Sequence, residues 1–484
     1  MNVPLWMSQS LSKDDQFLTG FEESLLANDS NNNNNNEYVE NPAATNPTSS
    51  TKPTSPIIIA ICMIGMGAST FATSEALFLQ TEMFTKCFNY SNFFGVALMC
   101  LFLPGLIVQI LQNQFDEQYN RKFSTRTATA FRILIGQTFI LVPCFIFFTK
   151  LHQDHPNQLA SSPPPQSLLI GCFIFIGFGC AFVYGSSSQI VALLPSKFHA
   201  YFFVGAYLNS IVMAPVNTAV GQLFTIKDHQ CTEIYWNKIT KFYAISTFTN
   251  CFGVLSFVVL CYCTVTGKRA VMGVGTNEND NEEGGGIGLP MEFVLNPASP
   301  TLSERGRGIK KINSGQIWRQ LFGVGLTMVL VLVENMLVSS SYHKIPVAGQ
   351  MFAIPTVMMY SFYMSMCVGS MTSSFKCVQK KLTTSILFGL TLLRVPGVVL
   401  IYWYVGLNPI DIRNGTAPIN PGDYGVLVFG SIYIWLGGII FSRSFSIATE
   451  MFTRPEEKAV SATVMNVLYF FGICAVSTGI LLTA

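Results

Sequence analysis

Eleven separate apolar runs, each roughly 19 to 27 residues long, make up most of the chain after Thr54. An α-helix needs about 20 apolar residues to cross roughly 30 Å of hydrocarbon, and only helices and closed barrels satisfy their own backbone hydrogen bonds there. Charged residues are 11% of the chain, against about 25% in soluble domains. The sequence therefore predicts an all-α polytopic membrane protein. The predicted membrane helices cover residues 56–79, 92–112, 131–149, 167–193, 199–224, 242–266, 319–341, 350–375, 384–407, 424–446 and 459–482.

The distribution of Lys and Arg predicts which ends of these helices face the cytoplasm. With the N-terminus inside and the C-terminus outside, the inner segments and the helix ends bordering them hold 20 of the 28 basic residues, the outer loops hold seven, and Arg394 lies inside a helix. That excess on the inner side is the positive-inside bias. Two N-x-S/T sequons, at Asn89 and Asn414, fall in predicted outer loops, where glycosylation occurs. We expect the plasma membrane rather than an internal membrane.

The segments outside the predicted helices divide the chain into four parts. Residues 1–55 contain a run of Asn with many Ser, Thr and Pro, and residues 267–318 are rich in Gly, Asn and Glu before becoming basic. Such compositions bury little apolar surface, so we expect both segments to be disordered and cytoplasmic. The long inner loop separates six helices (56–266) from five (319–484). This division predicts two half-bundles in a major-facilitator-like arrangement.

Cysteine and histidine give no sign of a metal site or an enzyme. Most of the 13 cysteines fall within the predicted helices and no pair has metal-ligand spacing, while the five histidines are scattered over loops and helix ends. No P-loop or nucleophile-elbow motif is present in the sequence. We therefore expect no cofactor, no metal and no catalysis. A disulfide between Cys87 and Cys231, both in predicted outer loops, is left open.

Four charged residues fall within predicted membrane helices: Glu75, Glu334, Arg394 and Arg443. An ionised side chain there costs roughly 2.5–3.5 kcal/mol on insertion scales, so each calls for a partner or a water-filled cavity. For Arg394 and Arg443, the sequence favours neither a structural ion pair nor a functional role over the other. Glu75 and Glu334 are in the first and seventh helices, which have equivalent places in the two halves. Midplane substrate sites are built there in transporters with repeated halves.

Small and polar residues are concentrated in the fourth predicted helix. Gly177, Gly179 and Gly185 belong to a face on which another helix backbone can approach closely. Tyr184 is followed by Ser186, Ser187, Ser188 and Gln189, a denser polar set than packing requires. Buried polar groups need partners, so this set indicates a cavity on that side of the helix.

Three segments carry a resemblance to a known family. The first is Gly185 to Gly205, with LLPSKF at its turn; the second is FRILIG at 131–136, including Arg132; the third is the C-terminal stretch from FSRSFS through Pro455, Glu456 and Glu457. They resemble the equilibrative nucleoside transporters, which have eleven helices and a large loop after the sixth. The resemblance implies that fold and the carriage of nucleosides or nucleobases, and it makes Arg132 and Arg443 structural charges.

The chain also departs from the family pattern. Where the family's first helix has Pro-Trp-Asn, this chain has Phe71, Ala72 and Thr73; Tyr184 replaces a substrate-contacting Gln. Met366 and Ser370 stand where an Asp and an Arg hold the nucleoside. These losses, with two added acids, favour a cationic substrate or proton coupling. The candidate substrate-binding residues are Ser69, Ala72, Glu75, Tyr184, Ser188, Glu334, Asn335, Met366 and Ser370.

Two functions follow as hypotheses. The first is transport of nucleosides or nucleobases by alternating access, facilitative or proton-coupled, with another small polar or cationic solute as the variant. The second is a transport-dead receptor or scaffold, which would gain if Glu75 and Glu334 were salt-bridged and sealed from any cavity. In the first, Glu334 exchanges protons and pairs with Arg394 when the cavity closes, and Glu334→Gln removes the pH dependence without unfolding the protein. The expected partners are a small solute and the lipid bilayer, not nucleic acid; partners of the tail and loop stay open.

Overall fold

The structure is a computed structural model of the 484-residue chain. It describes residues 55–79, 93–122, 125–153, 166–221, 234–264, 314–342, 354–407 and 421–483. The chain divides into two units, Met1–Thr51 and Lys52–Ala484. The first unit lies outside the described residues, as does most of the predicted inner loop; α11 begins at Ser314, inside the range predicted as loop. The fold below is that of the second unit.

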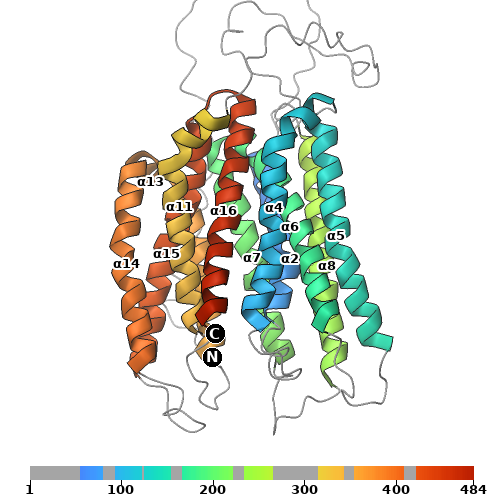
Figure 1. The fold of residues 1–484 in the computed structure, drawn as a ribbon, viewed down its shortest axis with the longest axis vertical. Coiled ribbons are helices and arrows are strands. Elements are labelled where there is room, and N and C mark those ends of the chain that lie inside the picture. Colours follow the sequence, from blue (N-terminus) through green and yellow to red (C-terminus); the bar gives the residue numbers. More distant parts are fainter. Residues whose placement is uncertain are drawn as a thin grey trace, which may run out of the picture. The chain divides into compact units, whose positions relative to one another are not determined.

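Every long element in the described residues is a helix, and eleven of them have 20 residues or more (Figure 1). A short helix, α13 (Lys376–Lys381), a 3₁₀ turn, η1 (Ser196–Phe198), and a π-helical turn, η2 (Val259–Cys263), complete the described elements. The long helices are α2 (Pro56–Leu79), α4 (Phe93–Lys122), α5 (Thr125–Gln153), α6 (Gln166–Leu193), α7 (His199–Gly221), α8 (Ile234–Val258), α11 (Ser314–Tyr342), α12 (Ile354–Ser373), α14 (Thr384–Leu407), α15 (Pro421–Glu450) and α16 (Pro455–Thr483).

Within the described residues, nine of these helices are long and apolar enough to cross a membrane. They indicate a multi-pass integral membrane protein. The two long helices outside this set are α7 and α12, whose side chains are described only over residues 199–212 and 360–373. The predicted crossings by these two helices, and so the total of eleven, stay predictions.

Local sequence explains where the helices begin and how far they run. Pro56, Pro421 and Pro455 are first residues of α2, α15 and α16, where a missing N–H is harmless and the fixed φ suits a helix. Glu456 and Glu457 follow in the first turn of α16, at the positive end of its dipole. Helices α4, α5 and α15 extend beyond their predicted apolar cores, because a helix continues into water after its apolar stretch ends.

The helices pack in two groups. The first helix group (α2, α4, α5, α6, α7, α8) makes its main contacts internally, as does the second helix group (α11, α12, α14, α15, α16). The groups meet where α4 and α6 pack on α16, and α7 packs on α12 and α15. Polar and aromatic side chains gather at this junction, and they form the candidate site.

Glycines bring helix backbones into direct contact within each group. A Cβ on Gly67 of α2 would lie 2.0 Å from the carbonyl oxygen of Phe202 in α7, and one on Gly205 would lie 2.1 Å from that of Ile64. In the second group, a Cβ on Gly369 of α12 would lie 2.3 Å from the Trp435 carbonyl oxygen in α15. Small residues at such contacts allow the close packing on which membrane helices depend.

The surface of the bundle is apolar. Helix α14 has a third of its membrane window buried, and Leu393 and Trp403 are 73% and 63% exposed. Phe248 of α8 and Phe322 of α11 are also largely exposed. Exposed large side chains over so much surface are what a lipid-facing wall requires; water would not favour them.

Candidate functional site

A cavity of about 120 Å³ lies between the two helix groups. Its walls combine nine aromatic side chains with a few small and polar ones, and none of the described lining residues is charged. Both groups contribute to it, so a molecule inside would contact both. The lining residues are Phe71, Ser74, Leu98, Phe102, Tyr184, Phe203, Ala206, Tyr207, Leu332, Asn335, Met336, Ser339, Phe362, Tyr363, Met366, Phe441 and Tyr469.

Three aromatic rings from three helices make one wall of this cavity. Tyr184 of α6 has its ring centroid 5.4 Å from that of Phe71 in α2 and 5.2 Å from that of Tyr469 in α16. Phe71 and Tyr469 are 6.1 Å apart. At these separations the rings contact one another, so they form a continuous apolar wall and leave no room for a ligand between them.

The polar side of the cavity leads to a buried ion pair in the second helix group. Arg394 of α14 and Glu334 of α11 are 2.9 Å apart (Nη1 to Oε2), with 3% and 7% of their side chains exposed. The Tyr433 hydroxyl donates to the same carboxylate oxygen at 3.1 Å, and the Arg394 guanidinium lies 4.1 Å above the Tyr433 ring. Arg394 Nη2 also donates to Asn335 Oδ1 at 2.6 Å. Asn335 therefore joins the ion pair to the cavity, because it is a lining residue.

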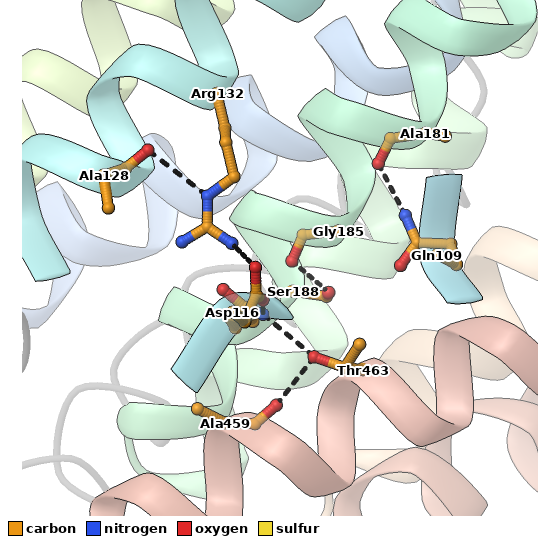
Figure 2. A network of polar contacts seen from close by, with 10 residues as sticks. Gln109, Asp116, Ala128, Arg132, Ala181, Gly185, Ser188, Ala459 and Thr463 are labelled. Carbon is orange, nitrogen blue, oxygen red and sulfur yellow. Dashed lines mark hydrogen bonds and ion pairs between the residues drawn. The ribbon is translucent and has the colours of Figure 1, made fainter. Parts of the chain in front are cut away.

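A second polar cluster closes the junction at the end of the bundle where α4 joins α5 and α6 joins α7, the predicted cytoplasmic end (Figure 2). Arg132 of α5 forms an ion pair with Asp116 of α4 at 2.5 Å. Gln189 of α6 donates to the other Asp116 oxygen and, at 2.9 Å, to Thr463 Oγ1 of α16.

One helical turn deeper, Asn466 Nδ2 of α16 donates to Ser188 Oγ at 2.6 Å. Ser188 in turn donates to the Gly185 carbonyl at 2.9 Å. We call Gln189–Thr463 and Ser188–Asn466 the α6–α16 latch, since both bonds link the first helix group to the second.

Several amides beside this latch have polar atoms that no described group bonds. Gln109 of α4 donates to the Ala181 carbonyl at 2.7 Å, but its Oε1 has no partner among the described residues. The same is true of both side-chain polar atoms of Gln112 and of Asn466 Oδ1. Gln109 and Gln112 converge on Gly185, where a Cβ would lie 2.4 Å from Gln112 Oε1 and 2.6 Å from Gln109 Nε2.

Three of the predicted substrate-binding residues line the cavity: Tyr184, Asn335 and Met366. Glu334 precedes Asn335 in α11 and is paired with Arg394, the pairing predicted from the sequence for a closed cavity. The remaining described candidates are buried away from the lining. Ser69 donates to the Met66 carbonyl, Ser188 belongs to the latch, and Ala72 and Ser370 are fully buried.

The two predicted structural charges are both paired. Arg132 holds Asp116, and Arg443 donates to both carboxylate oxygens of Glu450, at 2.9 and 3.0 Å, and to the Gln379 carbonyl at 3.0 Å. These bonds tie α4 to α5 and α15 to the segment that contains α13.

Some predicted sites fall where the structure gives no description. Glu75 lies in α2, but its side chain is not described. The sequons at Asn89 and Asn414, and the pair Cys87 and Cys231, lie outside the described residues. Within the described residues, no three His, Cys, Asp or Glu side chains come together in a way that could hold a metal ion.

Sequence reasoning missed Asp116, Tyr433 and Tyr469. Asp116 lies beyond the apolar run of its helix, so it looked like an ordinary inner-loop charge. Tyr433 and Tyr469 are aromatic residues in apolar helices, and such residues are far more often part of a core than of a site. The one signal in the sequence was the need of Glu334 and Arg394 for partners.

Comparisons with known proteins add little to this geometry. No family model matches the chain, and no curated protein matches it. Among solved structures, it is similar to the major facilitator superfamily proton:xylose symporter XylE bound to 6-bromo-6-deoxy-D-glucose, with a TM-score of 0.43 and 13% sequence identity over 88% of this chain and 87% of that one. A likeness of this degree assigns no solute, so function has to be argued from the cavity.

Proposed function

We propose that this protein is a membrane transporter that moves small, neutral solutes with a planar heterocycle, of the nucleoside or nucleobase class, by alternating access. The observation that supports this most is the cavity, to which both helix groups contribute and which is lined by aromatic side chains with Asn335, Ser74 and Ser339 among them. Apolar walls with a few placed polar groups are the usual make-up of a small-molecule site. Aromatic walls suit flat heterocycles, whose faces they can stack against.

The size of the cavity supports a closed conformation. Its volume of about 120 Å³ is well below the roughly 300–1,000 Å³ of typical ligand pockets. The α6–α16 latch holds the two groups together at the predicted cytoplasmic end. We propose that all eleven long helices cross the membrane, N-terminus inside, and that the six-helix and five-helix groups rock against each other about the cavity. The latch must break for the cavity to open inward.

The buried ion pair bears on the charge of the solute. The sequence favoured a cationic solute or proton coupling because the family's Asp and Arg are replaced by Met366 and Ser370 and two acids, Glu75 and Glu334, are added. In the structure the charge of Glu334 is balanced by Arg394 at 2.9 Å, and the described lining of the cavity is uncharged. No described lining residue would neutralise a cation, which favours a neutral solute. Both facilitated diffusion and proton coupling fit this geometry, and a pH gradient separates them.

One observation favours the alternative, a transport-dead receptor or scaffold. This alternative would gain if both Glu75 and Glu334 were salt-bridged and sealed from any cavity. Glu334 is salt-bridged and is not among the residues that line the cavity, so one of the two glutamates meets that condition. Against it stands a cavity to which both helix groups contribute, which a scaffold does not need. Transport stays the better supported of the two.

The test is uptake by proteoliposomes that contain the purified protein. We expect saturable uptake of labelled nucleosides or nucleobases and much weaker uptake of organic cations, measured with and without a pH gradient. Tyr469→Ala, in the aromatic wall, should reduce uptake, whereas Leu393→Ala, on the lipid-facing surface, should leave it unchanged. If the wild-type protein neither takes up nor binds any member of the panel at millimolar concentration, the proposed solute class is wrong.

A further inference from the structure

The orientation of the Asn335 side-chain amide is fixed by Arg394, which is itself held in place by its neighbours. The Arg394 guanidinium is fixed by Glu334 on one side and by Tyr433 on the other: the Tyr433 ring lies 4.1 Å below it and the Tyr433 carbonyl accepts from Nη2 at 3.3 Å. Arginine carries hydrogen-bond donors and no acceptor. The 2.6 Å contact from Arg394 Nη2 to Asn335 can therefore be made only through the amide oxygen.

Since the oxygen of Asn335 faces Arg394, its NH₂ group must face the other way. Its partner on that side, among the described residues, is the thioether sulfur of Met366, at 3.5 Å. A thioether is a weak acceptor. Both Asn335 and Met366 line the cavity. The side chain thus presents a donor to the cavity that a stronger acceptor on a solute would take over.

Gly437 of α15 leaves the space that this group fills. A Cβ there would lie 2.6 Å from Asn335 Oδ1, 2.8 Å from Asn335 Nδ2 and 2.8 Å from Arg394 Nη2, so a larger residue would displace one of the two side chains. Asn335 itself is 2% exposed. Phe362 and Tyr363 of α12 also line the cavity, and their rings lie at 88° to each other with centroids 5.4 Å apart.

We propose that Asn335 is the specificity-determining residue of the transport site: its Nδ2 donates a hydrogen bond to a carbonyl oxygen of a planar heterocyclic solute. The Glu334–Arg394 pair is a positioning device that keeps this donor, and not the amide oxygen, turned toward the cavity. This inference rests on the proposed function and names the chemical group that the site reads.

The experiment uses matched heterocycles that differ by a carbonyl or an amino group at one ring position: uracil and cytosine, hypoxanthine and adenine, and the corresponding nucleosides. The wild-type protein should prefer the carbonyl member of each pair in Vmax/KM. In Asn335→Asp the cavity is offered an acceptor in place of the donor. We expect the preference to fall by about tenfold to a hundredfold, because a site built to bond one group leaves a buried polar atom unpaired with its analogue. Most of the change should be in KM.

Three further variants keep the test decisive. Asn335→Ala removes the donor without adding charge and should bring the ratio close to one, which covers the case in which the aspartate variant does not fold. Met366→Leu removes the weak acceptor and leaves the donor, so the preference should persist. Glu334→Gln with Arg394→Gln lets the amide turn either way, and the ratio should fall even if the protein folds and transports; a purely structural pair would leave it unchanged.

The outcomes separate this inference from the proposed function. A wild-type protein that transports these solutes, with Asn335→Asp and Asn335→Ala retaining its ratio, overturns the role of Asn335 and leaves transport standing. A wild-type protein that takes up none of them overturns both. A ratio that falls in the Asn335 variants and persists in Met366→Leu supports the assignment.

Discussion

The buried ion pair of Glu334 and Arg394 predicts a measurable loss of thermal stability when one partner is neutralised. Glu334→Gln keeps the shape of the side chain and its hydrogen bond with the Tyr433 hydroxyl, which lies 3.1 Å from Oε2. It removes the negative charge 2.9 Å from Arg394 Nη1. Arg394, with 3% of its side chain exposed, is then left as a buried cation without a counter-charge. The ion pair therefore predicts a loss of stability in this variant, in addition to the loss of pH dependence expected from the sequence.

The size of the effect can be worked from the geometry. Two unit charges 2.9 Å apart attract by about 6 kcal/mol at an effective dielectric constant of about 20, and removing one partner of a buried pair costs about 3–5 kcal/mol. At about 2.1 cal/mol/K of unfolding entropy per residue, a bundle of this size should melt about 3–6 °C lower. Arg394→Gln should cost a similar amount. The double variant should recover most of the loss, because it leaves no uncompensated charge.

The assay is thermal unfolding of the purified wild type, the two single variants and the double variant in one detergent. Unfolding is followed by tryptophan fluorescence or by loss of the monodisperse peak in size-exclusion chromatography. Leu393→Ala, next to Arg394 but facing lipid, controls for the effect of substitution in α14. A melting temperature for Glu334→Gln within about 1 °C of wild type would refute the reasoning. So would a double variant whose loss equals the sum of the two single losses, since additive effects mean that the side chains do not interact.

Three further predictions test the packing, the junction and the topology. Gly67→Leu should abolish folded, monodisperse protein, since its Cβ alone would lie 2.0 Å from the α7 backbone, while Gly389→Leu, with nothing within 4 Å of a Cβ, should purify like wild type. Cysteines at Gln189 and Thr463 in a cysteine-depleted background, joined by a short bifunctional maleimide, should stop uptake; uptake that continues after complete cross-linking would show that the α6–α16 latch does not have to open. Enzymatic deglycosylation should increase electrophoretic mobility, and Asn414→Gln should remove most of that shift; a shift unaffected by the substitution would place the glycan elsewhere.

Much of the fold follows from the apolar runs. The predicted helices at 56–79 and 384–407 have the same bounds as α2 and α14, and the fourth predicted helix differs from α6 by one residue. The longer helices were underestimated: α4 ends at Lys122, ten residues past its predicted end. Hydrophobicity marks the part of a helix that lies in lipid, whereas backbone hydrogen bonding continues in water wherever neighbouring helices support it.

The candidate site was predictable only where polarity stood out against an apolar background. Glu334, Asn335 and Tyr184 were found because a polar group inside a membrane helix needs an explanation. Asp116 and Tyr469 were not, since a charge near a helix end and an aromatic ring in a core are the ordinary case. Which helices meet is a property of the folded bundle, so the joining of Asn335 to Arg394 and of α6 to α16 had no counterpart in the sequence.

The amides beside the α6–α16 latch have a consequence for how the protein would move. Gln109 Oε1, Gln112 Oε1 and Asn466 Oδ1 are buried without hydrogen-bond partners among the described residues, and buried polar atoms left unpaired disfavour the conformation that buries them. Separation of α6 from α16 would let water reach these atoms, which offsets the loss of the two latch bonds. A junction of this kind can reopen, as a gate that acts in every cycle requires. An interface in which every buried polar atom had a hydrogen-bond partner would be harder to reopen.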